Sequence, residues 1–340
     1  MAHIAILGTG MIGTSIGLAL KHNSDVTIEK IIGYDRNKNN MRAAKKLGAI
    51  DESEGNLRKA IKDVSIIILA APVLSNHLLI EEIAEFVSQG IVVTDTGSTK
   101  NATLTHAIKY LPSDVDFIGS HPMAGVTGVG PEHADKNLFK DQIWVITAPA
   151  DAKAQSVNAI FHLAESLGAK PMIMDPEEHD AYVAAISHAP MVISQALFRL
   201  MRNSEAWPEL SVLAAGGFKS VTRLSGTDPS MAFDIVKTNR DQIIHWLNRY
   251  IAELDMLRRN FEDLDDEDLF RLIAQIELDY SAFMEGAIGR QEESNMEGTS
   301  SDFGALLIGH AMKDKLDEMT KGAEQRVEEK DLARRMRRDI

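Results

Sequence analysis

The feature that most constrains the fold is a glycine-rich turn close to the N-terminus, set between an apolar strand and a helix. His3–Leu7 is a short β-rich run, and Gly8-Thr9-Gly10-Met11-Ile12-Gly13 follows it at once, ahead of apolar residues at helical spacing. In this context the pattern is typical of dinucleotide binding. Gly8 would allow the tight turn, Gly10 would let the backbone approach a pyrophosphate, and Gly13 would let the helix pack closely on the strand. The free N–H groups of the helix start would face the phosphates.

A carboxylate stands where the ribose of such a nucleotide would lie. The second predicted strand, Ile28–Tyr34, ends at Asp35, which follows Gly13 by 22 positions. An acidic residue at this place accepts the ribose hydroxyls and would repel a 2′-phosphate. We therefore expect NAD rather than NADP, with Arg36 as the neighbour that could accommodate the phosphate. A glycine turn that binds no nucleotide is the alternative.

The alternation of strands and helices continues, and the strands end in small and polar residues. We expect further helices at 38–47, 78–87 and 156–167 and further strands at 64–71, 91–94, 115–118, 144–147 and 170–174. Ala70-Ala71-Pro72 ends one strand, where small side chains would let a cofactor lie against the backbone, and Asp95–Lys100 follows the next. Ligands of open α/β sheets bind beyond the carboxyl ends of the strands. The predicted fold class is therefore α/β, with an N-terminal Rossmann-type doubly wound parallel sheet.

A histidine among small residues follows the strand at 115–118, in Gly119-Ser120-His121-Pro122-Met123-Ala124-Gly125. We interpret this segment as a loop that lets a ligand come close. Histidine changes its protonation state near neutral pH, so His121 is a candidate acid or base. Taken alone, a histidine before a proline is also typical of a solvated turn.

The pattern changes to helices without strands from Asp175 onward. Asp175 as N-cap, Pro176 at the first helical position and Glu178 at the third make a well-formed helix start. Pro190 inside the following apolar stripe should remove a backbone donor and kink the helix beside His188. A hydrogen-bonded helix histidine is the alternative to a functional role for His188.

Three segments make up the predicted organisation. These are a dinucleotide-binding domain at 1–175, a helical substrate and dimerisation domain at 176–285, and a linker with a charged helical tail at 286–340. Long apolar stripes at about 240–261 and 266–283 favour a homodimer interface. For the tail, a solvated helix is favoured over a partner-binding one.

Composition excludes several classes of function. The formal net charge of −14 disfavours non-specific binding to nucleic acid or to an anionic membrane surface. No run approaches the ~20 uninterrupted apolar residues of a membrane span, and no signal peptide is recognisable, so the cytoplasm is expected. The absence of cysteine excludes disulfides and thiolate chemistry, and the 11 histidines show no metal-ligand spacing. An anionic substrate would need a local cationic clamp.

Taken together, these segments resemble the prephenate/arogenate dehydrogenases of tyrosine biosynthesis. The resemblance runs from about residue 3 to residue 265, in the same order along the chain, and the segment around His121 is specific to that family. It is carried by Gly8–Gly13, Asp35, Asp95–Lys100, Gly119–Gly125, Ser187-His188 and Gly216–Arg223.

The resemblance implies a role for five residues. His121 would bond the substrate's ring hydroxyl as catalytic base, and Ser98 would contact that hydroxyl and the nicotinamide. Arg223 would bind a substrate carboxylate, His188 would lie in the substrate pocket, and Lys219 would add positive charge there. The implied reaction is the NAD-dependent oxidative decarboxylation of prephenate to 4-hydroxyphenylpyruvate. It needs a neutral His121, so we expect the rate to fall on the acid side near the ~6.5 reference pKa, shifted by the surroundings.

Two departures from the family pattern leave the substrate open. Val126-Thr127-Gly128 stands where many relatives have Ser/Thr-Glu-Lys, and Met231-Ala232 stands where an aromatic residue is frequent. Prephenate, arogenate and an amino-substituted prephenate analogue all stay possible. Residues 286–340 show no βαββαβ pattern, so tyrosine feedback through such a module is not expected.

Two further alternatives lie outside this family. A β-hydroxyacid dehydrogenase would share the cofactor half, but it needs a lysine in the first helix of the second domain, and 177–200 has none. A non-catalytic NAD-binding sensor would have no use for Ser98, His121 and Arg223 together.

Overall fold

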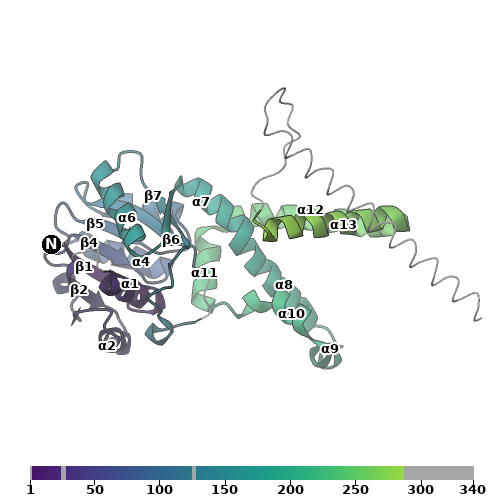
Figure 1. Ribbon diagram of the computed structural model, residues 1–340, viewed down its shortest axis with the longest axis horizontal. Coiled ribbons are helices and arrows are strands. Elements are labelled where there is room, and N and C mark those ends of the chain that lie inside the picture. The colour runs from purple at the N-terminus through teal and green to yellow at the C-terminus, as the bar shows by residue number, and fades with distance from the viewer. Residues whose placement is uncertain (1, 24–27, 125–127, 287–340) are drawn as a thin grey trace, which may run out of the picture. The chain divides into compact units, whose positions relative to one another are not determined.

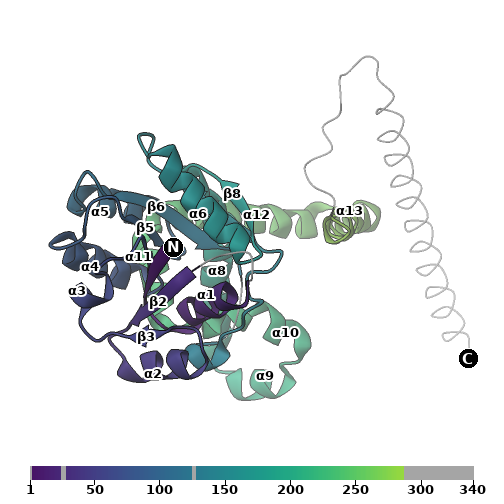
Figure 2. The same ribbon diagram turned by 60° about the vertical axis from the view of Figure 1, so that its left-hand side comes forward.

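The computed structural model describes residues 2–23, 28–124 and 128–286. By the contacts between Cα atoms, the chain divides into two compact units. The first runs through Asn248 and the second begins at Arg249. The first unit holds a sheet with helices on both faces and the helices that follow it (Figures 1 and 2).

The sheet has eight strands in the order β3-β2-β1-β4-β5-β6-β7-β8, and every neighbouring pair is parallel except β6 with β7. The order reverses between β1 and β4, which is the switch point where doubly wound sheets bind ligands. The predicted fold class is thereby confirmed. The strands are β1 Ala2–Leu7, β2 Ile28–Tyr34, β3 Glu52–Ser53, β4 Ile66–Leu69, β5 Val92–Asp95, β6 Asp116–Pro122, β7 Ile143–Thr147 and β8 Lys170–Ile173.

Two hydrophobic clusters, one on each face, hold the sheet between its helices. Along β1 the buried residues alternate, with Ile4 and Ile6 in one cluster and Ala5 and Leu7 in the other. This is the period of two that a strand covered on both faces requires. The helices of this part are α1 Met11–His22, α2 Lys38–Lys46, α3 Leu57–Ala60, α4 Val73–Ala84, α5 Asn101–Tyr110, η1 Pro131–His133 and α6 Ala154–Ser166.

The helical part opens with one long run that carries a local irregularity. Asp175 caps α7 by accepting from the N–H groups of residues 177 and 178. A five-residue π-type turn, η2, then ends at His188, and Pro190 lies in the first turn of α8. The irregular backbone expected beside His188 is therefore present. The bounds are α7 Pro176–Val183, η2 Ala184–His188, α8 Ala189–Arg202, α9 Trp207–Leu213, α10 Gly216–Val221, η3 Arg223–Gly226, α11 Pro229–Thr238, α12 Arg240–Asp263 and α13 Asp266–Met284.

The run Pro176–Arg202 is, within the described residues, the one helix long and apolar enough by length and composition to cross a membrane. Its buried polar side chains at His179, Asp180, His188 and Ser194 instead bond neighbouring segments of the same chain. The run is therefore bonded to the rest of the chain along one face, while 33% of its apolar window is buried.

The structure corrects the expected loop around His121. Gly119 to Pro122 belong to β6, because β7 pairs with them antiparallel from Gly119↔Thr147 to Pro122↔Trp144. Glycine is needed there, since a Cβ on Gly119 would lie 2.5 Å from the Thr147 Oγ1. In the sheet part, β3, α3, α5 and the short η1 are absent from the predicted pattern, and the helix expected at 78–87 begins at Val73. Residues 125–127 of the motif loop, and the tail beyond residue 286, lie outside the described residues.

Candidate active site

The glycine turn after β1 is shaped by contacts and leaves one side open. Gly8 has a positive φ of 104°, and a Cβ there would lie 2.6 Å from the backbone of Ala70 at the end of β4. A Cβ on Gly13 would lie 1.9 Å from the Gly8 carbonyl oxygen. A Cβ on Gly10, directly before α1, would meet nothing within 4 Å. The turn thus packs on the sheet through Gly8 and Gly13 and keeps open space at Gly10, as a pyrophosphate cradle requires.

Asp35 lies at the end of β2 and is tied to this turn. Its Oδ2 accepts from the Thr9 N–H at 2.8 Å and from the Thr9 hydroxyl at 3.2 Å, and its Oδ1 accepts from the Asn37 N–H at 2.8 Å. The carboxylate is therefore oriented beside the glycine turn. On the other side of the turn, Ala71 is partly exposed and Pro72 is exposed, just before α4. These residues fit a dinucleotide across the switch point.

A fully buried ion pair fixes the segment between β5 and α5. The Lys100 Nζ lies 2.6 and 2.5 Å from the two carboxylate oxygens of Asp95, and it donates to the Ser120 carbonyl at 2.5 Å. Asp95 also accepts from the N–H groups of Gly97 and Ser120. Burial lowers the pKa of Lys100 and the Asp95 carboxylate opposes that shift. The pair thereby joins the loop of Ser98, whose side chain is partly exposed, to the strand that carries His121.

His121 is linked to two buried residues of α7. Its Nδ1 lies 2.9 Å from the Nε2 of His179, and the Nδ1 of His179 lies 2.8 Å from the Asp180 Oδ1. Asp180 also accepts from the backbone N–H groups of Lys100 at 2.8 Å and Asn101 at 2.9 Å. Desolvation above all, and then repulsion from His179 and Lys100, hold the pKa of His121 well below its usual value. His121 is therefore neutral at pH 7, as a base must be.

His188 is buried and shares a partner with Asp180. The Asn239 Nδ2 donates to the Asp180 carbonyl at 2.8 Å and contacts the His188 Nδ1 at 3.1 Å. Because an amide nitrogen can only donate, the Nδ1 of His188 accepts. Desolvation lowers the pKa of His188 to about 4, while Asp180 acts in the opposite direction. A neutral His188 next to this cluster could bind a ligand through its Nε2–H.

The two expected cations stand apart from this bonded cluster. Lys219 lies in α10 and Arg223 begins η3, and both side chains are exposed. Among the described residues, neither cation has a hydrogen-bond or ion-pair partner, so both charges are free for an anion. The structure thus links His121 and His188 through Asp180, places Ser98 on the adjoining loop, and shows no bond from Arg223 or Lys219 to that cluster within the described chain.

Sequence reasoning missed His179 and Asp180, and it named Asp95 and Lys100 only as the ends of a loop at the ligand edge, not as a buried ion pair. The sequence does carry a signal for His179 and Asp180. They precede the buried Val183 and Ala184 by four positions, so they share the buried face of α7. Titratable residues on such a face need partners inside the protein. The identity of those partners is set by the packing of α7 on β6 and α5.

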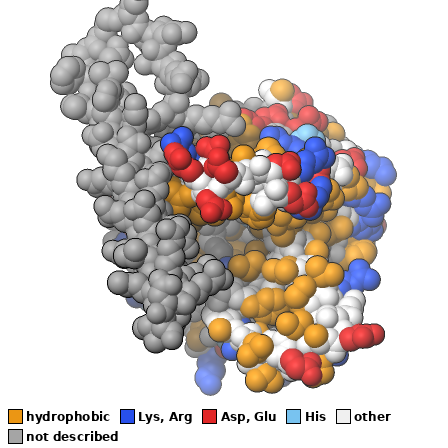
Figure 3. Space-filling model, turned by 90° about the vertical axis from the view of Figure 1, so that its right-hand side faces the viewer, with side chains coloured by type: hydrophobic (Ala, Val, Ile, Leu, Met, Phe, Trp, Pro, Cys, Tyr) orange, Lys and Arg blue, Asp and Glu red, His pale blue; other side chains and the backbone are white. Residues whose placement is uncertain are grey.

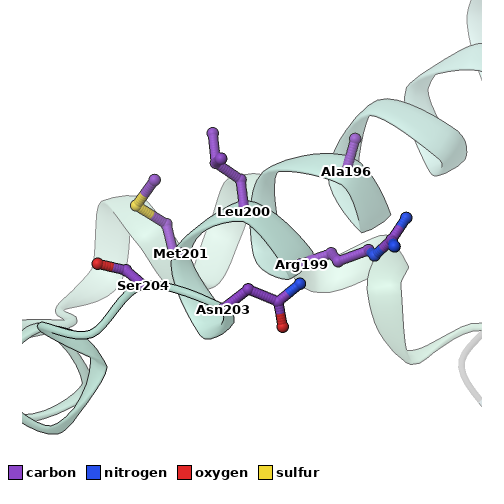
Figure 4. Close-up of a pocket in the computed structure, with 6 residues that line it drawn as sticks. All are labelled: Ala196, Arg199, Leu200, Met201, Asn203 and Ser204. Carbon is purple, nitrogen blue, oxygen red and sulfur yellow. The ribbon is translucent and has the colours of Figure 1, made fainter.

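A hollow at the end of α8 lies outside this cluster. Figure 4 shows its side chains fanning out around the helix end, without a common centre. We assign it no catalytic role because it holds no acid or base. Its lining is Ala196, Arg199, Leu200, Met201, Asn203 and Ser204.

Comparisons with known proteins agree with this architecture. Residues 16–173 match the family model for the prephenate dehydrogenase nucleotide-binding domain, and residues 175–275 match that for the prephenate dehydrogenase dimerization domain. A prephenate dehydrogenase of Bacillus subtilis (strain 168) is 35% identical over 270 residues, which cover 79% of this chain and 72% of that protein.

Two solved structures are similar over nearly their whole length. Prephenate dehydrogenase from A. aeolicus, in complex with hydroxyphenyl propionate and NAD+, has a TM-score of 0.77 and 25% identity, covering 83% of this chain and 98% of that one. Synechocystis arogenate dehydrogenase has a TM-score of 0.71 and 26% identity, covering 83% and 99%. The chain therefore belongs to the prephenate dehydrogenase family and is a dehydrogenase with a nucleotide-binding domain.

Proposed function

We propose that this enzyme catalyses the NAD-dependent oxidative decarboxylation of prephenate to 4-hydroxyphenylpyruvate, a step of tyrosine biosynthesis, in the cytoplasm. The observation that carries the proposal is the state of His121. It is partly exposed at the carboxyl edge of the sheet, on the same edge as the glycine turn, and its pKa lies well below the usual value. An unprotonated imidazole at a nucleotide site is the group that oxidation of an alcohol requires.

The chemistry follows from the substrate. Prephenate carries a ring hydroxyl on the carbon opposite a quaternary carbon with a carboxylate. His121 accepts the hydrogen bond of that hydroxyl and draws its proton as hydride leaves the same carbon. Bound NAD would accept the hydride at its nicotinamide ring. The bond to the carboxylate breaks, carbon dioxide leaves, and the electron pair of that bond makes the ring aromatic while the carbonyl π pair moves to the ring oxygen. That oxygen takes the proton back from His121, which gives the phenol of 4-hydroxyphenylpyruvate and leaves the base neutral. Ser98 would hold the hydroxyl against His121.

A cationic clamp would bring the dianionic substrate to a protein of charge −14. Arg223 is suited to grip a carboxylate with two hydrogen bonds, and its guanidinium has no other partner among the described residues. Lys219, one helical turn before it, would add positive charge, and His188 would contribute a neutral donor. The roles of Arg223, Lys219 and His188 are each part of this proposal.

NAD is proposed over NADP because of Asp35. Its carboxylate is held beside the glycine turn by Thr9, where it would bond a ribose and repel a 2′-phosphate. Arg36 is exposed next to it and is the group that would work against this preference.

We also propose that the enzyme is a homodimer through its helical part. The match of residues 175–275 to a dimerization domain supports it. Large hydrophobic side chains are exposed on that part, among them Leu200 at 66%, Val212 at 84% and Leu213 at 77%. Figure 3 shows how hydrophobic side chains gather over this side of the molecule. Surface of this kind is typically covered in an oligomer.

The test is the formation of NADH or NADPH with purified enzyme in four combinations, NAD or NADP with prephenate or arogenate. The proposal expects the highest rate with NAD and prephenate. A higher rate with arogenate would make the enzyme an arogenate dehydrogenase, the main alternative. No rate in any combination, with NAD binding confirmed by calorimetry, would contradict the proposed reaction and direct attention to an amino-substituted analogue. His121→Asn should lose most of the rate and keep NAD binding, whereas a sensor would be indifferent.

A further inference from the structure

We propose that His179 and Asp180 are positioning residues for the base. Through two hydrogen bonds, they set which nitrogen of His121 carries its proton, so that Nε2 is the atom that faces the reacting hydroxyl. This inference rests on the proposed function, in which His121 is the base. It assigns the task of orienting the base, which β6 of the sheet carries, to two residues of α7 in the helical part.

The chain of bonds begins at a fixed negative charge. Asp180 is 4% exposed, and each of its carboxylate oxygens accepts a backbone N–H, from Lys100 at 2.8 Å and from Asn101 at 2.9 Å. These N–H groups belong to Lys100, the N-cap of α5, and to Asn101, the first residue of this ten-residue helix, where the partial positive charge of the helix favours an anion. An ionised carboxylate can only accept hydrogen bonds.

The positions of the two ring protons follow from that charge. The Nδ1 of His179 lies 2.8 Å from the Asp180 Oδ1 and must donate to it. In a neutral His179 the Nε2 then has a free lone pair. That lone pair lies 2.9 Å from the His121 Nδ1, which must donate in turn. The remaining nitrogen of His121, Nε2, is left with the lone pair that takes the substrate's proton. The reverse arrangement would set a lone pair of His179 against the carboxylate.

The same bonds stabilise His121 while it holds the proton. The positive charge that develops on its ring is opposed by Asp180 through His179, as a buried aspartate does for the base of serine hydrolases. The charged or titratable groups around His121 are His179 and Asp180 on α7, His188 on η2, and Lys100 with Asp95 beside the β5 loop. Among them, His179 bonds the ring directly.

Substitutions at His179 separate positioning from simple packing. A glutamine places its side-chain oxygen near the position of Nε2, so His179→Gln can still accept from His121. An asparagine places its polar atoms near the position of Nδ1, so His179→Asn keeps contact with Asp180 and loses His121. His179→Leu has neither contact. We expect kcat for NAD and prephenate to fall roughly 100–1,000-fold in the asparagine and leucine variants and within about tenfold in the glutamine variant.

The order of kcat among the three variants distinguishes a positioning role of His179 from a packing role. A packing role predicts a higher kcat for His179→Asn, which retains the bond to Asp180, than for His179→Gln. That order would overturn the proposal. Thermal denaturation and calorimetric NAD affinity, measured on each full-length variant, show whether the fold and the cofactor site are intact. If glutamine fails because its side chain does not fit, Asp180→Asn provides a second test, with an expected loss of at least about tenfold in kcat and little change in KM.

A measurement on the wild-type protein is independent of the substrate. Nitrogen-15 NMR of histidine-labelled enzyme, with His121→Asn to assign the signals, reports which ring nitrogen of His121 carries the proton. We expect protonation at Nδ1 at pH 7 and loss of that preference in His179→Leu. Protonation at Nε2 would overturn the proposal. If prephenate proves not to be the substrate but Nδ1 is protonated, the proposed function fails and the positioning role stands.

Discussion

Two alanine substitutions in the glycine turn should have opposite effects on stability and on NAD binding. In Gly10→Ala the new methyl group enters open space, and the backbone φ of −71° suits any residue. The fold should therefore tolerate it. The methyl group would, however, occupy the space proposed for the pyrophosphate. In Gly13→Ala the new Cβ would lie 1.9 Å from the Gly8 carbonyl oxygen and 2.9 Å from the Ile6 side chain.

The magnitudes follow from these contacts. Alanine at position 10 is a weaker N-cap than glycine but restricts the unfolded chain, and these effects of a few tenths to about 1 kcal/mol oppose each other. We expect Tm of the ligand-free protein to stay within about 2 °C and the Kd for NAD to rise at least about tenfold, or 1.4 kcal/mol. At Gly13 the overlap is with backbone, which cannot rotate away. Overpacking of about 3 kcal/mol should lower Tm by roughly 6–12 °C without any ligand.

Differential scanning fluorimetry with and without NAD, together with calorimetric titration, distinguishes the two variants. Wild-type enzyme should gain stability from saturating NAD, by about 2.7 kcal/mol at 100 times Kd. Without ligand, Gly10→Ala should match the wild type. At the same NAD concentration it should gain at most about 1.4 kcal/mol, because a tenfold weaker Kd leaves NAD at only about 10 times Kd. An unchanged Kd in Gly10→Ala would refute the assignment of this turn to the cofactor phosphates. An unchanged Tm in Gly13→Ala would refute the packing argument.

Four further predictions concern single charges. Asp35→Ser should raise the ratio of NADP to NAD activity on the order of tenfold, measured as kcat/KM, because it removes the group that repels a 2′-phosphate. Lys100→Met should destabilise the protein by about 3–5 kcal/mol in urea denaturation, since it leaves Asp95 buried without its cation, and Asp95→Asn in the same chain should recover part of the loss. Burial lowers the pKa of His188 to about 4, so below the reference value of about 6.5 the unfolded chain takes up a proton that the folded protein does not. The stability that the neutral His188 contributes is therefore complete above that reference value and is lost as the pH falls toward 4. His188 alone should account for roughly 3 kcal/mol of the loss of stability across that window, so His188→Asn should lose about that much less than wild type. Arg223→Gln should raise KM for prephenate about 10–100-fold at unchanged NAD affinity, and an unchanged KM would exclude it from the clamp.

The nucleotide-binding half was predictable because its signals are local. The strand expected at residues 28–34 has those bounds in the structure, and Gly48 after α2 has the positive φ of 80° that a helix end favours. The extension of β6 through His121 was not predictable in the same way. It depends on antiparallel pairing with β7, which lies more than 20 residues further along the chain and contacts β6 only in the folded protein.

The start of α4 shows a different limit. Ser75 and Asn76 are typical turn residues by sequence, yet they lie inside the helix. The Asn76 side chain is fully buried, accepts from the Ala71 N–H at 3.2 Å and donates to the Leu69 carbonyl at 3.3 Å. A residue that satisfies backbone groups at the end of β4 can be recognised only when the strand and the helix are both in place. Local propensity therefore placed the helix start five residues too late.

Asp180 connects the two histidines that matter most for the proposed chemistry. Its carboxylate bonds the start of α5 and accepts a hydrogen bond from the His179 Nδ1. Its carbonyl oxygen accepts from Asn239, which in turn bonds His188. A shift of α7 against the sheet would therefore disturb His121 and His188 together. Asn239 is 5% exposed and, among the described residues, has no hydrogen bond to His121 or His179. Its direct effect should therefore fall on His188, and it can reach His121 only through Asp180. Under the proposed function, α7 of the helical part completes the base that β6 carries, so a variant that displaces α7 should lose activity even when the sheet is intact.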